Sequence, residues 1–276
     1  MLSLMYITNN PDVALIAENA GVDRIFVDLE YIGKSIRQGG MDTVQSHHTL
    51  DDVARIRKVI TKSELLVRVN PIHDATSEYC SSEEEIDTAI SNGADILMLP
   101  FFKTAQEVKR FIEDVNGRCK TMLLVETPEA NEIIDDILEI KGIDECHIGL
   151  NDMSLGYHMK FMFELLANGT VDRLCAKFKA KGIKYGFGGI ASLGQGAVPA
   201  EHIILEHYRL GSTRAILSRS FCNTDKVHDL NVVRDTFNDG LSAIRTLERQ
   251  VEHGDYSLEN NHRETLKLID ALVEGQ

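Results

Sequence analysis

Short apolar runs alternate with longer segments of helical periodicity over most of the chain. A buried parallel strand has a short continuous apolar run, whereas an amphipathic helix repeats its apolar positions about every three or four residues. The pattern predicts strands at 4–7, 22–29, 65–69, 94–99, 122–125, 146–150, 184–187 and 212–217. Helical spacing predicts a helix between each strand and the next.

The order of these predicted elements indicates the fold class. Single helical segments separate the strands, which favours parallel pairing. Eight strand–helix units in 276 residues predict a (β/α)8 TIM barrel. A doubly wound open sheet is the alternative, but no glycine-rich dinucleotide-binding loop follows the first or second strand. We therefore expect residues 1–224 to form one barrel domain.

The remaining segment, 225–276, is longer than one closing helix requires. Helical patterns cover 230–250, with Gly240 as a weak point, and 258–273. We expect these residues to form an additional C-terminal helical extension. It would pack either on its own barrel or on a neighbouring subunit, and the pattern alone favours neither.

Two carboxylates follow consecutive predicted strands near the middle of the chain. The run at 122–125 ends in Glu126, helical spacing covers 131–140, and the run at 146–150 is followed by Asp152. A βαβ unit brings the ends of its parallel strands side by side. Two carboxylates at neighbouring strand ends suit Mg²⁺ or Mn²⁺, which keep water or substrate in their remaining positions.

Charge and composition exclude some partners. The net charge is −14, which argues against nucleic acid or an anionic membrane surface, because both require clustered cations. No apolar run approaches the roughly 18 residues of a membrane span, and the first residues lack a signal-peptide pattern. The five cysteines are scattered and form no CxxC pair, which is typical of a reduced, cytoplasmic protein.

In a barrel of this type, the active site lies at the C-terminal ends of the strands. This rule selects the side chains that follow the predicted strands and leaves out most other carboxylates, which fall on helices. The selected residues are Glu30, Arg68, Asn70, Glu126, Asn151, Asp152, Gly188, Gly189 and Arg219. The paired glycines either let backbone amides approach a ligand closely or form a plain turn.

Four motifs contain several of these residues: VDLE at 27–30, VRVNP at 67–71, VETPEA at 125–130 and IGLNDMSLG at 148–156. They resemble the HpcH/HpaI aldolase and citrate lyase family of the phosphoenolpyruvate/pyruvate barrel superfamily, and the resemblance covers roughly residues 10–220. The resemblance implies a divalent metal on Glu126 and Asp152. It implies that Arg68 holds the carboxylate and oxygen of a pyruvate-like group. It also implies a homo-oligomer, a trimer or hexamer of barrels.

The chain departs from this family directly after Glu30. The aldolase branch has a histidine of its acid/base machinery there, and the citrate-lyase branch has an acidic residue, whereas this chain has Tyr31. The replacement candidates are His47 and His48 in the following loop, His73, or Tyr31 itself, since a histidine titrates near neutral pH. Glu30 is expected to orient metal-bound water rather than to bind the metal.

These observations predict a carbon–carbon lyase, a class II-type aldolase or a citrate-lyase-like enzyme, with a small 2-keto acid as substrate. Such an acid chelates Mg²⁺ or Mn²⁺, which stabilises the enolate that forms when the adjacent C–C bond breaks. Arg68 adds charge-assisted hydrogen bonds to the same group. Arg68, Glu30, His47 and His48 are the catalytic candidates, and Arg68, Asn70, Asn151, Gly188 and Gly189 the substrate-binding ones.

Two other functions stay open. One is a citrate-lyase-like enzyme acting on an acyl-CoA ester, although no compact basic cluster for the CoA phosphates is evident. Lys34 and Arg37 would bind a substrate phosphate or carboxylate, or face solvent. The other is a barrel that keeps its metal and ligand site without turnover and serves as a binding or regulatory subunit, which the missing acid/base residue motivates.

Overall fold

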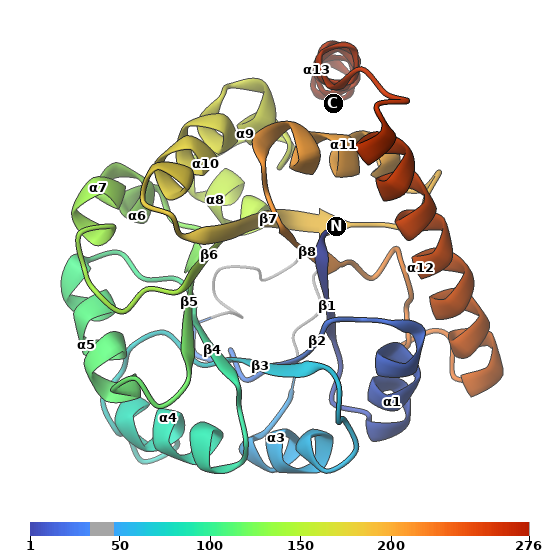
Figure 1. The fold of residues 1–276 in the computed structure, drawn as a ribbon. Coiled ribbons are helices and arrows are strands. Elements are labelled where there is room, and N and C mark those ends of the chain that lie inside the picture. The colour runs from blue at the N-terminus through green and yellow to red at the C-terminus, as the bar shows by residue number, and fades with distance from the viewer. Residues whose placement is uncertain (34–46, 276) are drawn as a thin grey trace.

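Eight parallel strands close into a barrel that a ring of helices surrounds (Figure 1). The strands are β1 (Ser3–Ile7), β2 (Arg24–Asp28), β3 (Glu64–Arg68), β4 (Ile96–Leu99), β5 (Lys120–Val125), β6 (Glu145–Ile148), β7 (Lys184–Ile190) and β8 (Arg214–Leu217). Each strand pairs with the next along the chain, and β8 pairs with β1. The (β/α)8 prediction is confirmed. The computed structural model describes residues 1–33 and 47–275, so Lys34 and Arg37 lie outside the described residues.

Alternation along the strands separates two apolar layers, because successive side chains of a strand point to opposite faces. On β2, Phe26 points into the barrel, while Ile25 and Val27 belong to the layer that packs against the helices. The interior cluster consists of Met5, Phe26, Leu66, Ile96, Met98, Met122 and Leu124. These side chains fill the barrel, so a ligand site can form only at its ends.

The N-terminal end of the barrel is closed by a buried ion network. Arg24, Glu145 and Arg214 are the first residues of β2, β6 and β8. Arg24 donates to both carboxylate oxygens of Glu145, at 2.6 and 2.8 Å, and Arg214 Nε donates to Glu145 Oε2 at 2.9 Å. Burial raises the pKa of Glu145, but the hydrogen bonds from these two arginines outweigh it and lower that pKa to about 2.

Polar caps determine where the surrounding helices begin. Asn10 accepts from the first backbone N–H groups of α1 (Pro11–Ala20). Capping boxes at Thr49, Ser81 and Thr104 start α3 (Leu50–Arg57), α4 (Ser82–Ser91) and α5 (Ala105–Val115). Further along the chain, α10 (Thr170–Ala180) and α11 (Ala200–Leu210) pack on β7.

The predicted helix at 131–140 is wrong in its bounds and its continuity. Thr127 caps a helix that already begins at Pro128, so the segment forms α6 (Pro128–Glu132) and α7 (Ile134–Ile137). Ile133 separates them with φ −99° and ψ 15°, outside the helical range. The predicted strand at 146–150 is also too long, because β6 ends at Ile148 and Leu150 begins α8 (Leu150–Gly156).

Glycines act differently in the later helices. Gly169, with φ +76°, separates α9 (Glu164–Ala167) from α10. Gly240, in contrast, does not interrupt α12 (Leu230–His253). A Cβ at Gly240 would lie 2.7 Å from the ring of Phe221, so this glycine allows close packing.

The C-terminal extension contacts its own barrel through both helices. α12 packs on α1 and α11, and α13 (Leu258–Glu274) packs on α11 and α9, at the edge of the ring (Figure 1). Contact with a second subunit stays a prediction. No helix in the described ranges 1–33 and 47–275 is long and apolar enough to cross a membrane.

We predict that Glu145→Ala destabilises the fold by ~3–5 kcal/mol, because it leaves buried guanidinium groups without their carboxylate. The matched control is Glu139→Ala, since Glu139 pairs with Lys181 on the surface and is 74% exposed. This variant should lose only about 0–1 kcal/mol of its free energy of unfolding. Urea unfolding followed by circular dichroism measures both values. Equal losses in the two variants would contradict the role of the ion network.

Candidate active site

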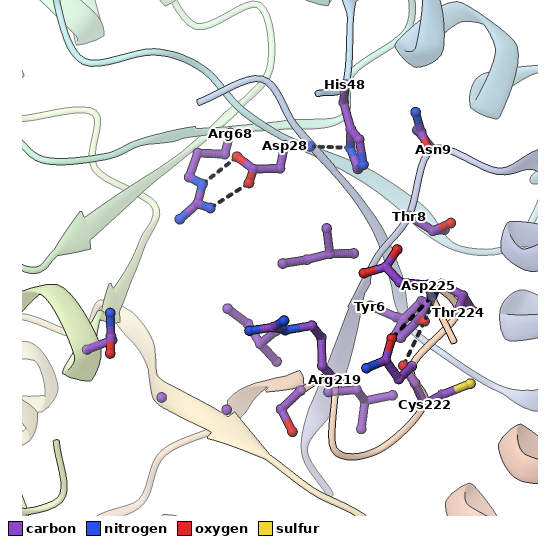
Figure 2. A pocket seen from close by; sticks show the side chains of 18 of the residues that line it. Tyr6, Thr8, Asn9, Asp28, His48, Arg68, Arg219, Cys222, Thr224 and Asp225 are labelled. Carbon is purple, nitrogen blue, oxygen red and sulfur yellow. Dashed lines mark hydrogen bonds and ion pairs between the residues drawn. The ribbon is translucent and has the colours of Figure 1, made fainter. Parts of the chain in front are cut away.

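A cavity of about 790 Å³ opens at the C-terminal ends of the strands. Its wall includes Ile7 of β1, Asp28 of β2, Arg68 of β3, Glu126 after β5 and Ser218 after β8, and Figure 2 shows part of it. Ligand pockets typically measure about 300–1,000 Å³. The position agrees with the rule that places barrel active sites at this face.

Arg68 and Asp28 form a two-bond ion pair across the ends of β2 and β3 (Figure 2). Arg68 Nε and Nη2 each donate to an Asp28 carboxylate oxygen at 2.7 Å, and Glu30 Oε2 lies 3.4 Å from Arg68 Nε. Burial lowers the pKa of Arg68, but the charges of Asp28 and Glu30 outweigh it and raise that pKa well above its usual range. The guanidinium is therefore a fixed positive charge at the cavity wall.

Glu126 is a buried carboxylate directly after β5, and its backbone surroundings hold it in place. Its Oε1 accepts a hydrogen bond from the backbone N–H of Phe101 at 3.0 Å. A Cβ at Gly149 would lie 2.6 Å from Glu126 Cβ and 2.7 Å from Oε2, so the carboxylate fits only because residue 149 is glycine. Burial and the negative charges of Glu30 and Asp152 raise the pKa of Glu126 well above its usual range.

Asp152 lies in the first turn of α8 and lines the cavity together with Glu126. The two carboxylates are close enough for their negative charges to repel each other, and a bound cation would reduce that repulsion. Among the described residues, no group of three or more His, Cys, Asp or Glu side chains is arranged to hold a metal ion. A two-carboxylate site of hard oxygen donors fits Mg²⁺ or Mn²⁺, which commonly complete their coordination with water and substrate.

The histidine and tyrosine candidates fall into two groups. His47 and His48 line the cavity, and His48 Nδ1 accepts the backbone N–H of Asp28 at 3.0 Å (Figure 2). His73 instead contacts the carbonyl oxygens of Pro71 and Cys80 and is absent from the described cavity wall. Tyr31 is 47% exposed and likewise absent from that wall.

Asn70 supports the loop after β2. Its Oδ1 accepts the backbone N–H groups of Tyr31 and Ile32 at 2.8 and 2.9 Å, and its Nδ2 donates to Glu85 at 2.7 Å. Neither Asn70 nor Glu30 is part of the described cavity wall. Asn151, Gly188, Gly189 and Arg219 do line the cavity, as their positions at strand ends suggested.

His147 is a cavity residue that the sequence reasoning missed. It points into the barrel from β6, and its Nε2 donates to the carbonyl oxygen of Gly188 at 3.0 Å, since a carbonyl can only accept. Burial lowers the pKa of His147 to about 4, so the ring is neutral near pH 7. The missed signal was the two-residue period, which places His147 on the same face as Glu145.

Fold and site together define a (β/α)8 barrel with an acidic, arginine-bearing mouth, and comparisons with known proteins give its family. The family model for HpcH/HpaI aldolase/citrate lyase matches residues 2–187. The chain therefore belongs to the HpcH/HpaI aldolase/citrate lyase family, and the predicted resemblance is confirmed. A search of curated proteins finds no match.

Solved structures of this fold are similar at low sequence identity. The HpcH/HpaI aldolase of Desulfitobacterium hafniense DCB-2 is 16% identical, with a TM-score of 0.59 over 79% of this chain and 86% of the other. A family protein from Burkholderia cenocepacia J2315 has the same identity and TM-score, over 84% and 94%. The citrate synthase SbnG is 16% identical, with a TM-score of 0.58 over 92% and 95%. These likenesses concern the fold.

We predict that Gly149→Ala weakens Mn²⁺ binding, because the new Cβ displaces the Glu126 carboxylate. The matched control is Gly189→Ala, whose Cβ would meet its nearest neighbour, the backbone oxygen of Ile216, at an ordinary 3.4 Å. Isothermal titration with Mn²⁺ measures both affinities. If both variants bound Mn²⁺ as the unmodified chain does, the packing of Gly149 would not position the carboxylate.

Proposed function

We propose that this protein is a divalent-metal-dependent carbon–carbon lyase of the aldolase type that acts on a 2-keto acid. The observation that carries the proposal is the convergence of Glu126, Asp152 and Arg68 on one cavity. Two carboxylates offer a site for Mg²⁺ or Mn²⁺, and a guanidinium offers charge-assisted hydrogen bonds for a carboxylate. Membership of the aldolase/citrate lyase family supports the same reaction class.

The chain's own residues would divide the work as follows. Glu126 and Asp152 would hold the cation, which when bound supplies a Lewis acid for the keto oxygen. Asp28 fixes Arg68 through two of its five N–H donors, so the guanidinium keeps its orientation. The remaining donors would orient the substrate carboxylate. Glu30, whose Oε2 lies 3.4 Å from Arg68 Nε, would help to hold the guanidinium in place.

His48 would handle the proton, as the residue that replaces the family's acid/base group. The backbone N–H of Asp28 donates to its Nδ1, so the neutral ring carries its proton on Nε2. This contact orients the imidazole at the cavity wall next to Asp28. His47, on the same wall, is the second choice.

An acyl-CoA substrate receives less support. The CoA phosphates require several cations, yet no lysine lines the cavity within the described residues. The likeness to a citrate synthase at 16% identity concerns the fold and does not favour that substrate. A cytoplasmic homo-oligomer, trimer or hexamer, completes the proposal.

We predict that the protein catalyses exchange of the methyl protons of pyruvate in D₂O, followed by NMR, with Mg²⁺ or Mn²⁺ but not with EDTA. This assay requires only enolate formation and no second substrate. Asp152→Ala should reduce the exchange to its rate in EDTA, because the variant removes one of the two carboxylates that would hold the cation.

The matched control for this assay is Asp135→Ala, since Asp135 pairs with Lys177 on the surface and is 76% exposed. Its exchange rate should equal that of the unmodified protein. A folded, metal-loaded protein that shows no exchange would contradict the proposal and favour the CoA-ester or non-catalytic alternatives.

A further inference from the structure

His147 is a buried polar residue that the proposed reaction does not use. It is 1% exposed and lines the cavity from β6. Burial lowers the pKa of His147 to about 4, so the ring is neutral near pH 7. Because Nε2 donates to the carbonyl oxygen of Gly188, Nδ1 carries no proton and can only accept. Nδ1 is buried and has no hydrogen-bond partner among the described residues.

Stability alone does not explain a histidine at this position. The bond to Gly188 stabilises the fold, whereas a buried acceptor without a partner destabilises it, so the two effects oppose each other. A leucine would occupy a similar volume and would bring neither effect. The bond is therefore more informative for what it does to Gly188 than for its contribution to stability.

The bond joins β6 to β7 beyond the end of their main-chain pairing. The last residue of β7 that pairs with β6 is Phe187, and Gly188 follows it. Against β8, segment 186–189 of β7 contains one residue more than its partner segment 214–216, which is the pattern of a β-bulge. His147 therefore fixes an irregular part of β7 to the neighbouring strand.

Gly188 in turn lies against the start of α8. Its φ of +52° is in the left-handed region, and a Cβ at this position would lie 2.8 Å from Leu150 Cδ1. Leu150 is the buried first residue of α8, which packs on β7 (Figure 1) and carries Asp152 in its first turn. A shift of Gly188 toward α8 would therefore displace Leu150 and, with it, the turn that bears Asp152.

We propose that His147 is a positioning residue for the metal site. Its bond to Gly188 holds β7 against Leu150 and so keeps Asp152 in place at the cavity wall. The inference rests on the proposed role of Asp152 in holding a divalent cation. His147 acts through these contacts and would not bind the cation itself.

The first test replaces the ring with a side chain of similar volume that cannot donate. His147→Leu should raise the Kd for Mn²⁺, measured by isothermal titration, about tenfold, the usual effect of losing a group that orients a metal ligand. His147→Gln should restore most of the affinity, because its side-chain amide can again donate to Gly188.

The matched control is His207→Leu, since His207 is also fully buried and contacts β7 from the helix side. Its ring stacks on Phe187 with 3.9 Å between the ring centroids, and its Nδ1 lies 2.7 Å from Ser212 Oγ. The variant removes a buried hydrogen bond but leaves the bond from His147 to Gly188. Its Mn²⁺ affinity should equal that of the unmodified protein, even where urea unfolding shows a similar loss of stability.

A measurement on the unmodified protein is independent of how well the variants fold. Heteronuclear NMR of the imidazole rings distinguishes a nitrogen that carries a proton from one that does not. We expect His147 to carry its proton on Nε2 and none on Nδ1 near neutral pH. A proton on Nδ1 alone would overturn the inference, because the ring could not then donate to Gly188.

The outcomes separate the two proposals. If the unmodified protein binds no Mn²⁺, the proposed metal site fails and this inference fails with it. If it binds Mn²⁺ and folded His147→Leu binds as tightly, the metal site stands and His147 does not position it. An equal loss of affinity in His147→Leu and His207→Leu would also overturn the inference, since it would assign the effect to the general packing of β7.

Discussion

The accumulation of negative charge at the C-terminal end of the barrel is the constraint on which the site depends. The charges of Asp28, Glu30 and Glu126 act there on the guanidinium of Arg68, and the charge of Asp152 acts on Glu126. Burying like charges close together is unfavourable, so burial and the neighbouring negative charges raise the pKa of Glu126. Arg68 offsets part of the charge through its two bonds to Asp28. A divalent cation on Glu126 and Asp152 would offset more, and it would also supply the chemistry that the family requires.

The two ends of the barrel therefore have different tasks. At the N-terminal end, Glu145 receives hydrogen bonds from Arg24 and Arg214, and its lowered pKa indicates a matched, stabilising network. An apolar plug that includes Phe26 and Met122 separates the two ends. At the C-terminal end, burial and the negative charges of Glu30 and Asp152 instead raise the pKa of Glu126. Strongly shifted pKa values of this kind are common at functional sites, where the rest of the fold stabilises an otherwise unfavourable arrangement of charges.

The sequence was sufficient for the fold and for part of the site. Strand–helix alternation predicted all eight strands, and the rule on strand ends selected Glu126 and Asp152. Asp28 escaped notice because the predicted strand extended to residue 29 and placed Asp28 inside it, whereas β2 ends at Asp28. The break at Ile133 was missed because periodicity describes a helical face and not the backbone angles of one residue. Thr8, after β1, and Ser218, after β8, line the same cavity although they come from the two ends of the barrel sequence, which only the closed barrel brings together.

The most direct test of this account is titration with Mn²⁺ followed by electron paramagnetic resonance, which distinguishes free from bound Mn²⁺. The account predicts one tightly bound ion per chain, and its loss in Glu126→Gln, where the side chain keeps its shape without its charge. Glu129→Gln is the matched control, because Glu129 pairs with Lys103 at the surface and should leave the binding unchanged. Absence of Mn²⁺ binding, or binding that Glu126→Gln does not affect, would contradict the central claim.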